Sequence, residues 1–383
     1  MYYELNSDQE MLRDSIRRFM KTEVAPLISK HDVEKTFPFE ILQGLSQFGY
    51  IGGRIPEELG GMSMDHMTWA LLMEEAGYTW LSLRTMLNIT NGSIQKIASE
   101  GTPDQIERFL KPLLSGQRKS CTAISEPGVG SNIAQIQTRA DLVDDHYILN
   151  GRKLWITNGA FADFAIVVAR TFSPDCQGQL STFIVDREVT PYDVRRVDTM
   201  VLRSTGTAEL TFDSIKVPRA NLLGDEGGAL KRMLTSLDGA RVNIAMGAVG
   251  AAQAALDLSI DYARTRTQFG KPIGSFQLVQ KLIVDMTVKV EAARALSLRA
   301  AASLEKNSKD SRMACSIAKL YATEAAHEVA SMALQLHGGM GYSTDYPIER
   351  IFRDTRGGTI PEGTSEVQTL IIGREILGIS ALV

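Results

Sequence analysis

The sequence predicts an α+β protein, mostly α-helical and built in three parts, because the spacing of its apolar residues changes twice along the chain. Helix-like spacing fills residues 1–117, strand-like alternation fills 118–226, and long Ala- and Leu-rich helical patterns fill 227–383. We therefore expect an N-terminal helical domain, a middle antiparallel β domain and a C-terminal helical bundle. With 383 residues, 44% of them hydrophobic, the chain can bury a large core.

The N-terminal part is predicted to contain five helices. Ser7-Asp8-Gln9-Glu10 has the pattern of a capping box, and the apolar face that follows should end near Pro26. Further helices are expected over 38–48, 65–76 and 82–99. Thr102-Pro103-Asp104-Gln105 should open the fifth, since it supplies an N-cap residue and a proline at the first helical position.

The middle part alternates between short apolar runs and turn residues. Runs at 146–149 and 153–156 flank Asn150-Gly151, a strong two-residue signal for a β-hairpin. Further strands are expected over 164–169, 181–185 and 209–212. Such a series is typical of an antiparallel barrel or sandwich. Beyond it, three long helices are predicted over 233–266, 275–305 and 308–336.

Composition and charge argue against several classes of function. The net charge is −4 and no Lys/Arg-rich run occurs, which argues against nucleic acid and anionic membranes as partners. No apolar run is long enough to span a bilayer, and residues 1–6 lead directly into an acidic helix start rather than a secretory signal. The scattered cysteines and histidines match no disulfide or metal pattern, so we expect a cytoplasmic protein without a metal.

Five short motifs carry the chemical signal. They are Ser125-Glu126-Pro127-Gly128-Val129-Gly130-Ser131, Trp155-Ile156-Thr157-Asn158-Gly159, Arg266-Thr267-Gln268-Phe269-Gly270-Lys271-Pro272, Gln335-Leu336-His337-Gly338-Gly339-Met340-Gly341-Tyr342 and Ile360-Pro361-Glu362-Gly363-Thr364-Ser365-Glu366-Val367-Gln368. Together, in this order and spacing, they resemble the acyl-CoA dehydrogenase family over nearly the whole chain. The resemblance implies a middle β-barrel, a C-terminal four-helix bundle and FAD as the cofactor.

The resemblance implies a cofactor site between the β domain, the bundle and a neighbouring subunit. No Gly-x-Gly-x-x-Gly lies between a strand and a helix, so a Rossmann site is not supported. The resemblance implies that Ser125 faces the flavin, Ser131 the pyrophosphate, Trp155 the isoalloxazine ring, and that the Thr157 hydroxyl hydrogen-bonds flavin N5. The plainer alternatives are an ordinary Pro-Gly turn and an aromatic residue in a core.

A second group of residues is expected to reach the FAD of a neighbouring subunit. The resemblance places Arg266, Phe269, Gln277, Gln335, Gly338 and Gly339 around its adenosine diphosphate part, and adds Thr364 and Glu366 as further cofactor contacts. The plainer alternative for the first three is a polar turn between two helices. If the assignments hold, the working protein is a homo-oligomer, either a dimer or a homotetramer.

Glu362 is the candidate catalytic base. The α-proton of a thioester is weakly acidic, so its removal needs a positioned base whose pKa an apolar pocket has raised. Some relatives carry the base on the first bundle helix, but this chain has Ala240 there. Asp238 and Arg241 are expected to order the substrate pantetheine or the pocket wall, or else to form an intrahelical ion pair. The plainer alternative for Glu362 is a solvated carboxylate near a helix start.

Two residues bear on the substrate. Arg84 lies where glutaryl-CoA dehydrogenases place an arginine for a distal carboxylate, although a surface arginine on a helix is the plainer alternative. Pro361 stands where the family usually has tyrosine, which reshapes the pocket roof. Both favour a short or functionalised acyl chain over a long one.

The sequence therefore predicts FAD-dependent α,β-dehydrogenation of an acyl-CoA thioester. Electrons would leave through an electron-transfer flavoprotein or another acceptor. The first alternative is oxidation of a small acyl unit tethered to an acyl carrier protein. A non-catalytic flavin-binding scaffold, and a flavin oxidase or monooxygenase, also stay open.

Overall fold

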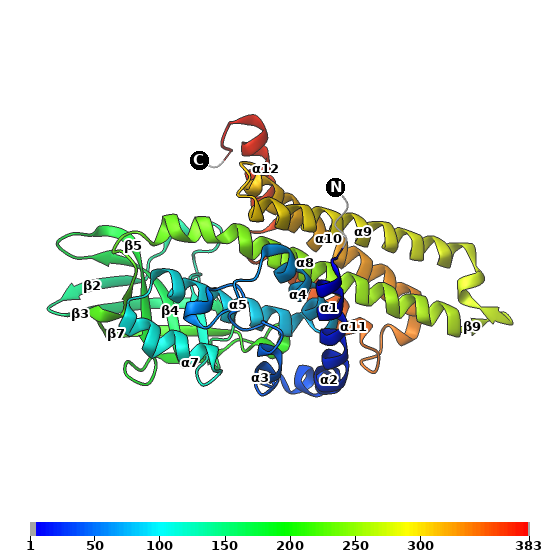
Figure 1. Ribbon diagram of the computed structural model, residues 1–383, viewed down its shortest axis with the longest axis horizontal. Helices are drawn as coiled ribbons and strands as arrows, with labels where there is room; N and C mark the ends of the chain where they lie inside the picture. The colour runs from blue at the N-terminus through cyan, green and yellow to red at the C-terminus, as the bar shows by residue number, and fades with distance from the viewer. Residues whose placement is uncertain (1–4, 382–383) are drawn as a thin grey trace.

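The computed structural model describes residues 5–381, so residues 1–4 of the segment that leads into the predicted acidic helix start lie outside it. Figure 1 shows the β domain at one end of the long axis and the long helices at the other. The N-terminal helices lie against both, and α8 (Ala229–Thr265) runs from the β domain toward the far end of the bundle. The predicted α+β architecture of helical, β and helical parts is confirmed.

The N-terminal part contains more short helices than predicted. Its elements are α1 (Ser7–Phe19), the π-helical η1 (Met20–Val24), α2 (Ala25–Glu34), α3 (Ile41–Ser46), η2 (Glu57–Leu59), α4 (His66–Thr79), α5 (Leu81–Glu100), α6 (Pro103–Gln105), η3 (Ile106–Leu110) and α7 (Lys111–Leu114). The first capping box uses Asn6 and Gln9, each one residue earlier than the predicted Ser7 and Glu10. Pro26 does not end the helix, because it stands in the first turn of α2, where its missing N–H is not needed.

The middle part forms one mainly antiparallel sheet. Its strands are β1 (Ser120–Ala123), β2 (Arg139–Val143), β3 (His146–Ile156), β4 (Phe164–Phe172), β5 (Gln177–Asp186), β6 (Asp193–Arg196), β7 (Ala208–Pro218) and β8 (Leu222–Leu223). They follow the order β6-β7-β3-β2-β4-β5-β8, with β1 paired to β4. The pairs β1–β4 and β2–β4 are parallel, so the sheet is mixed.

The hairpin predicted at Asn150-Gly151 is wrong. β3 continues through both residues, and its register against β7 shifts between Leu149 and Gly151, which marks a β-bulge. A Cβ on Gly151 would lie 2.6 Å from the Thr138 hydroxyl oxygen, so the glycine allows the close approach of that residue. The two-residue turn lies earlier, between the paired residues Val143 and His146.

The C-terminal part is a bundle of long helices. α8, α9 (Gln277–Glu305) and α10 (Ser311–His337) pack on one another, and α4 covers α8 and α9. The short strands β9 (Thr267–Gln268) and β10 (Lys271–Pro272) join α8 to α9 at the far end of the molecule (Figure 1). α11 (Ile348–Arg356) and α12 (Ser365–Leu377) follow and contact α10.

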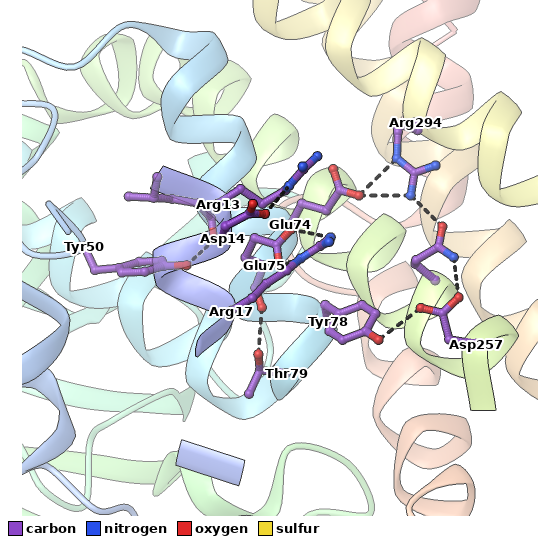
Figure 2. Close-up of polar contacts among 12 residues, drawn as sticks. Arg13, Asp14, Arg17, Tyr50, Glu74, Glu75, Tyr78, Thr79, Asp257 and Arg294 are labelled. Atoms are coloured by element: carbon purple, nitrogen blue, oxygen red, sulfur yellow. Dashed lines mark hydrogen bonds and ion pairs between the residues drawn. The ribbon is translucent and has the colours of Figure 1, made fainter. Parts of the chain in front are cut away.

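Polar contacts fix α4 between α1 and the bundle (Figure 2). The buried Glu75 carboxylate accepts two hydrogen bonds of 2.8 Å from Arg17 of α1. Arg294 of α9 donates to the neighbouring Glu74 at 3.0 Å. Bidentate and part-buried pairs of this kind hold one geometry better than exposed pairs do. α4 is thereby held in place where it lies against α8.

We expect Gly250→Ala to lower the free energy of unfolding by about 2 kcal/mol or more, because it forces two helix backbones apart. A Cβ at Gly250 of α8 would lie 2.0 Å from the Glu74 carbonyl oxygen and 2.5 Å from the Tyr78 nitrogen of α4. Gly92→Ala is the control, since a Cβ at this exposed helical position meets no atom within 4 Å. Urea unfolding of both variants tests this, and equal stability would contradict the close backbone contact.

Candidate active site

A cavity of about 920 Å³ is lined by all three parts of the molecule. It is lined by residues of α5, the loop after β1, the end of β3, α8 and the segment that precedes α12. Of the site residues predicted from sequence, it brings together Arg84, Ser125, Ser131, Trp155, Thr157, Arg241, Glu362 and Thr364. Residues nearly 280 positions apart in the chain, Arg84 and Glu362, therefore line one space.

The other predicted residues lie outside the lining of this cavity. Asp238 does not line the cavity but is hydrogen-bonded to Arg241, which does, and Glu366 is exposed in the first turn of α12. The remaining six are Arg266, Phe269, Gln277, Gln335, Gly338 and Gly339, and all are exposed around β9 and the adjoining ends of α9 and α10. Phe269 is 92% exposed. Within one chain these six residues do not reach the cavity.

Glu362 occupies an unusual backbone position. It follows η9 (Gly357–Thr359) and has a φ of 56°, in the left-handed region that non-glycine residues seldom adopt. Its side chain lines the cavity. Burial raises the pKa of this carboxyl group, and the Arg241 and Arg84 cations oppose the rise only in part. A carboxylate with a raised pKa, in a cavity that can admit a substrate, is suited to removing a proton.

Arg84 lies inside the molecule rather than on its surface, with only 5% of the residue exposed. Its guanidinium makes no hydrogen bond or ion pair to any of residues 5–381, and its Nε is buried without a partner. Burial lowers the pKa of Arg84 to about 10, and the Glu362 charge opposes this shift. Such a group is costly unless something pairs with it. Its free donors can bind a ligand group that has acceptor atoms.

Sequence reasoning missed three neighbours of Arg84. Thr85 has a buried hydroxyl without a partner, and the Asn88 side-chain oxygen accepts a 2.8 Å hydrogen bond from Asn243. Both line the cavity on the same turn of α5. Gly247 of α8 makes room, because a Cβ there would lie 2.7 Å from Arg84 Nε. The helical spacing of residues 84, 85 and 88 was the available signal.

Asp238 and Arg241 form the ion pair that the plainer alternative predicted. Arg241 Nη1 donates to Asp238 Oδ1 at 2.6 Å, three residues apart on α8. Arg241 nevertheless lines the cavity, and its Nε is buried without a partner. The two interpretations are therefore compatible, since the pair holds Arg241 at the cavity wall.

A buried ion pair, also missed from sequence, anchors the loop from Ser125 to Ser131. The Glu126 carboxylate accepts hydrogen bonds from the backbone N–H groups of Gln137 and Thr138, at 2.7 and 2.8 Å, and from Lys153 Nζ at 2.9 Å. Burial alone would raise the pKa of Glu126, but these donors outweigh it and the net shift is downward. The carboxylate therefore stays charged and fixes the loop before any ligand arrives.

The loop and the end of β3 fit a flavin nucleotide. A Cβ at Gly128 or Gly130 would meet no atom within 4 Å, so a phosphate group can approach this backbone closely. Trp155 is 59% exposed and lines the same cavity as Thr157. An exposed indole offers an apolar face, and the hydroxyl can donate a hydrogen bond.

We expect Lys153→Met to lower FAD content and to cost about 3 kcal/mol of stability, because it leaves Glu126 charged in a buried site without its cation. Lys153 is fully buried and also donates to the Ile124 carbonyl oxygen at 2.8 Å. The ratio of flavin to protein absorbance and the thermal midpoint measure the two effects. The double variant Glu126→Gln/Lys153→Met should recover part of the stability, and a wild-type flavin content in Lys153→Met would contradict the role of this pair.

No group of three or more His, Cys, Asp or Glu side chains within 5–381 is placed to hold a metal ion. None of the helices in that range is both long and apolar enough to cross a bilayer.

Comparison with known proteins agrees with the flavin-type site. Models of the N-terminal, middle and C-terminal domains of acyl-CoA dehydrogenases match residues 6–117, 121–215 and 227–377. The chain therefore belongs to the acyl-CoA dehydrogenase family. It is an oxidoreductase that depends on FAD, as the sequence analysis predicted.

Relatives of this chain match it from end to end. The probable acyl-CoA dehydrogenase YngJ of Bacillus subtilis is 38% identical over 98% of this chain and 100% of its own length. The caffeyl-CoA reductase-Etf complex subunit CarC of Acetobacterium woodii is 36% identical over the same shares. A solved glutaryl-coenzyme A dehydrogenase–glutaryl-CoA complex has a TM-score of 0.93 and 34% identity, covering 99% of this chain and 97% of that one. The prolyl acyl carrier protein oxidase AnaB has a TM-score of 0.91 and 32% identity, covering 98% and 100%.

Proposed function

We propose that this enzyme dehydrogenates a short acyl-CoA whose far end carries an anionic or polar group, with Glu362 as the base and Arg84 as the group that binds that end. The single observation that carries the proposal is the buried, unpaired guanidinium of Arg84 in the same cavity as Glu362. A long alkyl chain would leave this cation unpaired and desolvated, which is unfavourable. A carboxylate or similar acceptor would pair with it, and Thr85 and Asn88 could add hydrogen bonds.

The chemistry assigned to the chain is removal of the α-proton. Glu362 takes this proton from the carbon next to the thioester carbonyl, and a double bond forms between the α- and β-carbons. FAD, when bound, accepts the hydride that leaves the β-carbon. Ser125, Trp155 and Thr157 would hold the flavin, and Ser131 with the backbone at Gly128 would receive its phosphates. Because burial raises the pKa of Glu362, the carboxylate is a stronger base than an exposed one.

The pantetheine arm of the thioester is assigned to the wall formed by α8 and α12. Arg241 with its partner Asp238 stands on this wall, and Val367 of α12 lines it from the other side. Arg312 and Arg374 also line the cavity, and both are about half exposed. Cations in that position can attract a phosphate-bearing thioester from solvent.

The six exposed residues around β9 support an oligomer. In a single chain, the large apolar side chain of Phe269 would lie exposed to water. We assign this end of the bundle to the FAD of a second copy, in a dimer or tetramer. Electron-transfer flavoprotein is the proposed acceptor, because the relative CarC is named as a subunit of a complex with Etf.

A second candidate keeps the same chemistry on a substrate tethered to a carrier protein. Two observations favour it: the structural similarity to the prolyl acyl carrier protein oxidase AnaB, and the half-exposed Arg312 and Arg374 at the cavity. An acidic carrier protein would be attracted by such cations, and its tethered phosphopantetheine would reach the cavity.

An anaerobic panel of thioesters separates the two candidates. Each acyl group is offered once on CoA and once on a carrier protein, and the bleaching of the visible flavin band is followed. Faster bleaching by the CoA form of an acyl group with a polar end would support the first candidate. Bleaching by carrier-bound thioesters alone would favour the second, and faster bleaching by plain alkyl thioesters would overturn the role of Arg84.

A further inference from the structure

The segment that carries Glu362 has a backbone that needs support. Glu362 and Gly363 are consecutive residues with positive φ, at 56° and 91°. A non-glycine residue in this region is strained and persists only when its surroundings hold it. The segment is short, between the end of η9 at Thr359 and the N-cap of α12 at Thr364. Something outside the segment must therefore fix its peptide groups.

Two fully buried side chains supply that support. Lys319 of α10 donates from Nζ to the Gly363 carbonyl oxygen at 2.9 Å. Gln368, in the first turns of α12, donates from Nε2 to the same oxygen at 2.9 Å and to the Glu362 carbonyl oxygen at 3.1 Å. The Gly363 carbonyl is thus held from two different helices, and the Glu362 carbonyl is held from α12. This fixes the direction in which the Glu362 side chain leaves the backbone.

Lys319 is more than a structural hydrogen-bond donor. The only hydrogen-bond partner of its ammonium group among the described residues is a neutral carbonyl, and a buried ammonium with such a partner is costly. Burial lowers the pKa of Lys319 to about 8, so the group is still largely charged at pH 7. The charges that face it are Glu324, Glu362 and Glu366, which favour its charged form, and Arg241, which opposes it. The candidate base is therefore part of its electrostatic environment.

We propose that Lys319 is a positioning residue for the base: it fixes the Gly363 carbonyl so that Glu362 points into the cavity, and its charge helps to keep Glu362 ionised. Gln368 is the neutral second donor of the same support. The inference rests on the proposed function, because it presumes that Glu362 takes the α-proton. The charged groups that face Glu362 come from three helices: Arg84 and Lys96 of α5, Arg241 of α8 and Lys319 of α10.

Three variants, in which methionine replaces a side chain of similar shape, test this proposal. Lys319→Met removes donor and charge, Gln368→Met removes the neutral donor alone, and Lys309→Met removes an exposed lysine as the control. We expect the first two to slow flavin reduction by the substrate about 10- to 100-fold, as expected for a misplaced catalytic group, with little change in substrate affinity. Lys319→Met should also move the pH midpoint of the rate upward, because a cation near Glu362 is lost. Gln368→Met and Lys309→Met should not move it.

A wild-type rate and pH midpoint in Lys319→Met would overturn the inference, and so would an equal shift of the midpoint in Gln368→Met. If Lys319→Met does not fold, Lys319→Gln tests the role of the charge. A wild-type rate in Gln368→Met would then overturn the claim that these hydrogen bonds hold the segment that carries Glu362. Failure here differs from failure of the proposed function. A fully active Glu362→Gln would remove the base itself, whereas an inactive Glu362→Gln beside a wild-type-like Lys319→Met would remove only the role of Lys319.

Discussion

Replacing Glu362 by glutamine should abolish rapid flavin reduction by any acyl thioester while FAD stays bound. The amide has nearly the same shape but cannot accept the α-proton, and a general base contributes about 100- to 10,000-fold to a rate. Stopped-flow bleaching under anaerobic conditions measures the loss. Glu375→Gln, an exposed position near the end of α12, is the control and should react like the wild type.

The same residue sets the expected pH dependence. Burial raises the pKa of Glu362, and only the ionised form can take a proton, so the rate should increase with pH through this raised pKa. The midpoint should lie above about 4.3, the ordinary value for glutamate. A rate that does not change with pH, or a Glu362→Gln variant that keeps the wild-type rate, would show that another group is the base.

Replacing Arg84 by methionine should change which acyl groups react. We expect the rate constant kcat/KM for a short thioester with a terminal carboxylate to fall about 30-fold or more, since loss of one partner of a buried charge pair costs at least about 2 kcal/mol. The thioester of the same length without the carboxylate should react as well as before, or better, because the variant no longer presents an unpaired cation to it. Steady-state kinetics with this matched pair gives both values.

Two controls separate the contact of Arg84 with the acyl group from its electrostatic effect on Glu362. The Arg84 charge also lowers the pKa of Glu362, so both substrates are compared over a range of pH, at the plateau of each variant's pH–rate profile. Gly247→Ala should weaken the same preference without removing the charge, because its Cβ would press on the Arg84 side chain. An equal loss of kcat/KM with both substrates would mean that Arg84 supports the structure of the cavity and does not bind the far end of the acyl group.

The sequence predicts the fold well because its signals are local. Helical spacing and caps locate α4, α5, α8, α9 and α10 to within a few residues, and apolar alternation locates the strands β3, β4, β5 and β7 but misses β1, β2, β6 and β8. Asn150-Gly151 misleads because the pair occupies a bulge, where contact with Thr138 across the sheet outweighs the local preference for a turn. The π-helical turn before Pro26 is likewise invisible to helical spacing.

The site is predicted only in part, because much of it depends on contacts between distant segments. The motif around Glu362 and the position of Arg84 are recognisable in the sequence, and both residues line the cavity. Lys319 and Lys153 cannot be recognised in the sequence as site residues. Each is one lysine on a long element, and only the fold shows that it is fully buried. The adenosine end of the site stays a prediction, because its six residues lie at the far end of the bundle in one chain.

The most direct test of the central claim is a single anaerobic turnover with product analysis. The holoenzyme is mixed with a short acyl-CoA that carries a terminal carboxylate, and both the bleached flavin and the thioester product are quantified. The account predicts one 2,3-unsaturated thioester for each flavin reduced, with bleaching lost in Glu362→Gln. Bleaching without a new double bond, or a flavin that no acyl thioester reduces, would contradict it.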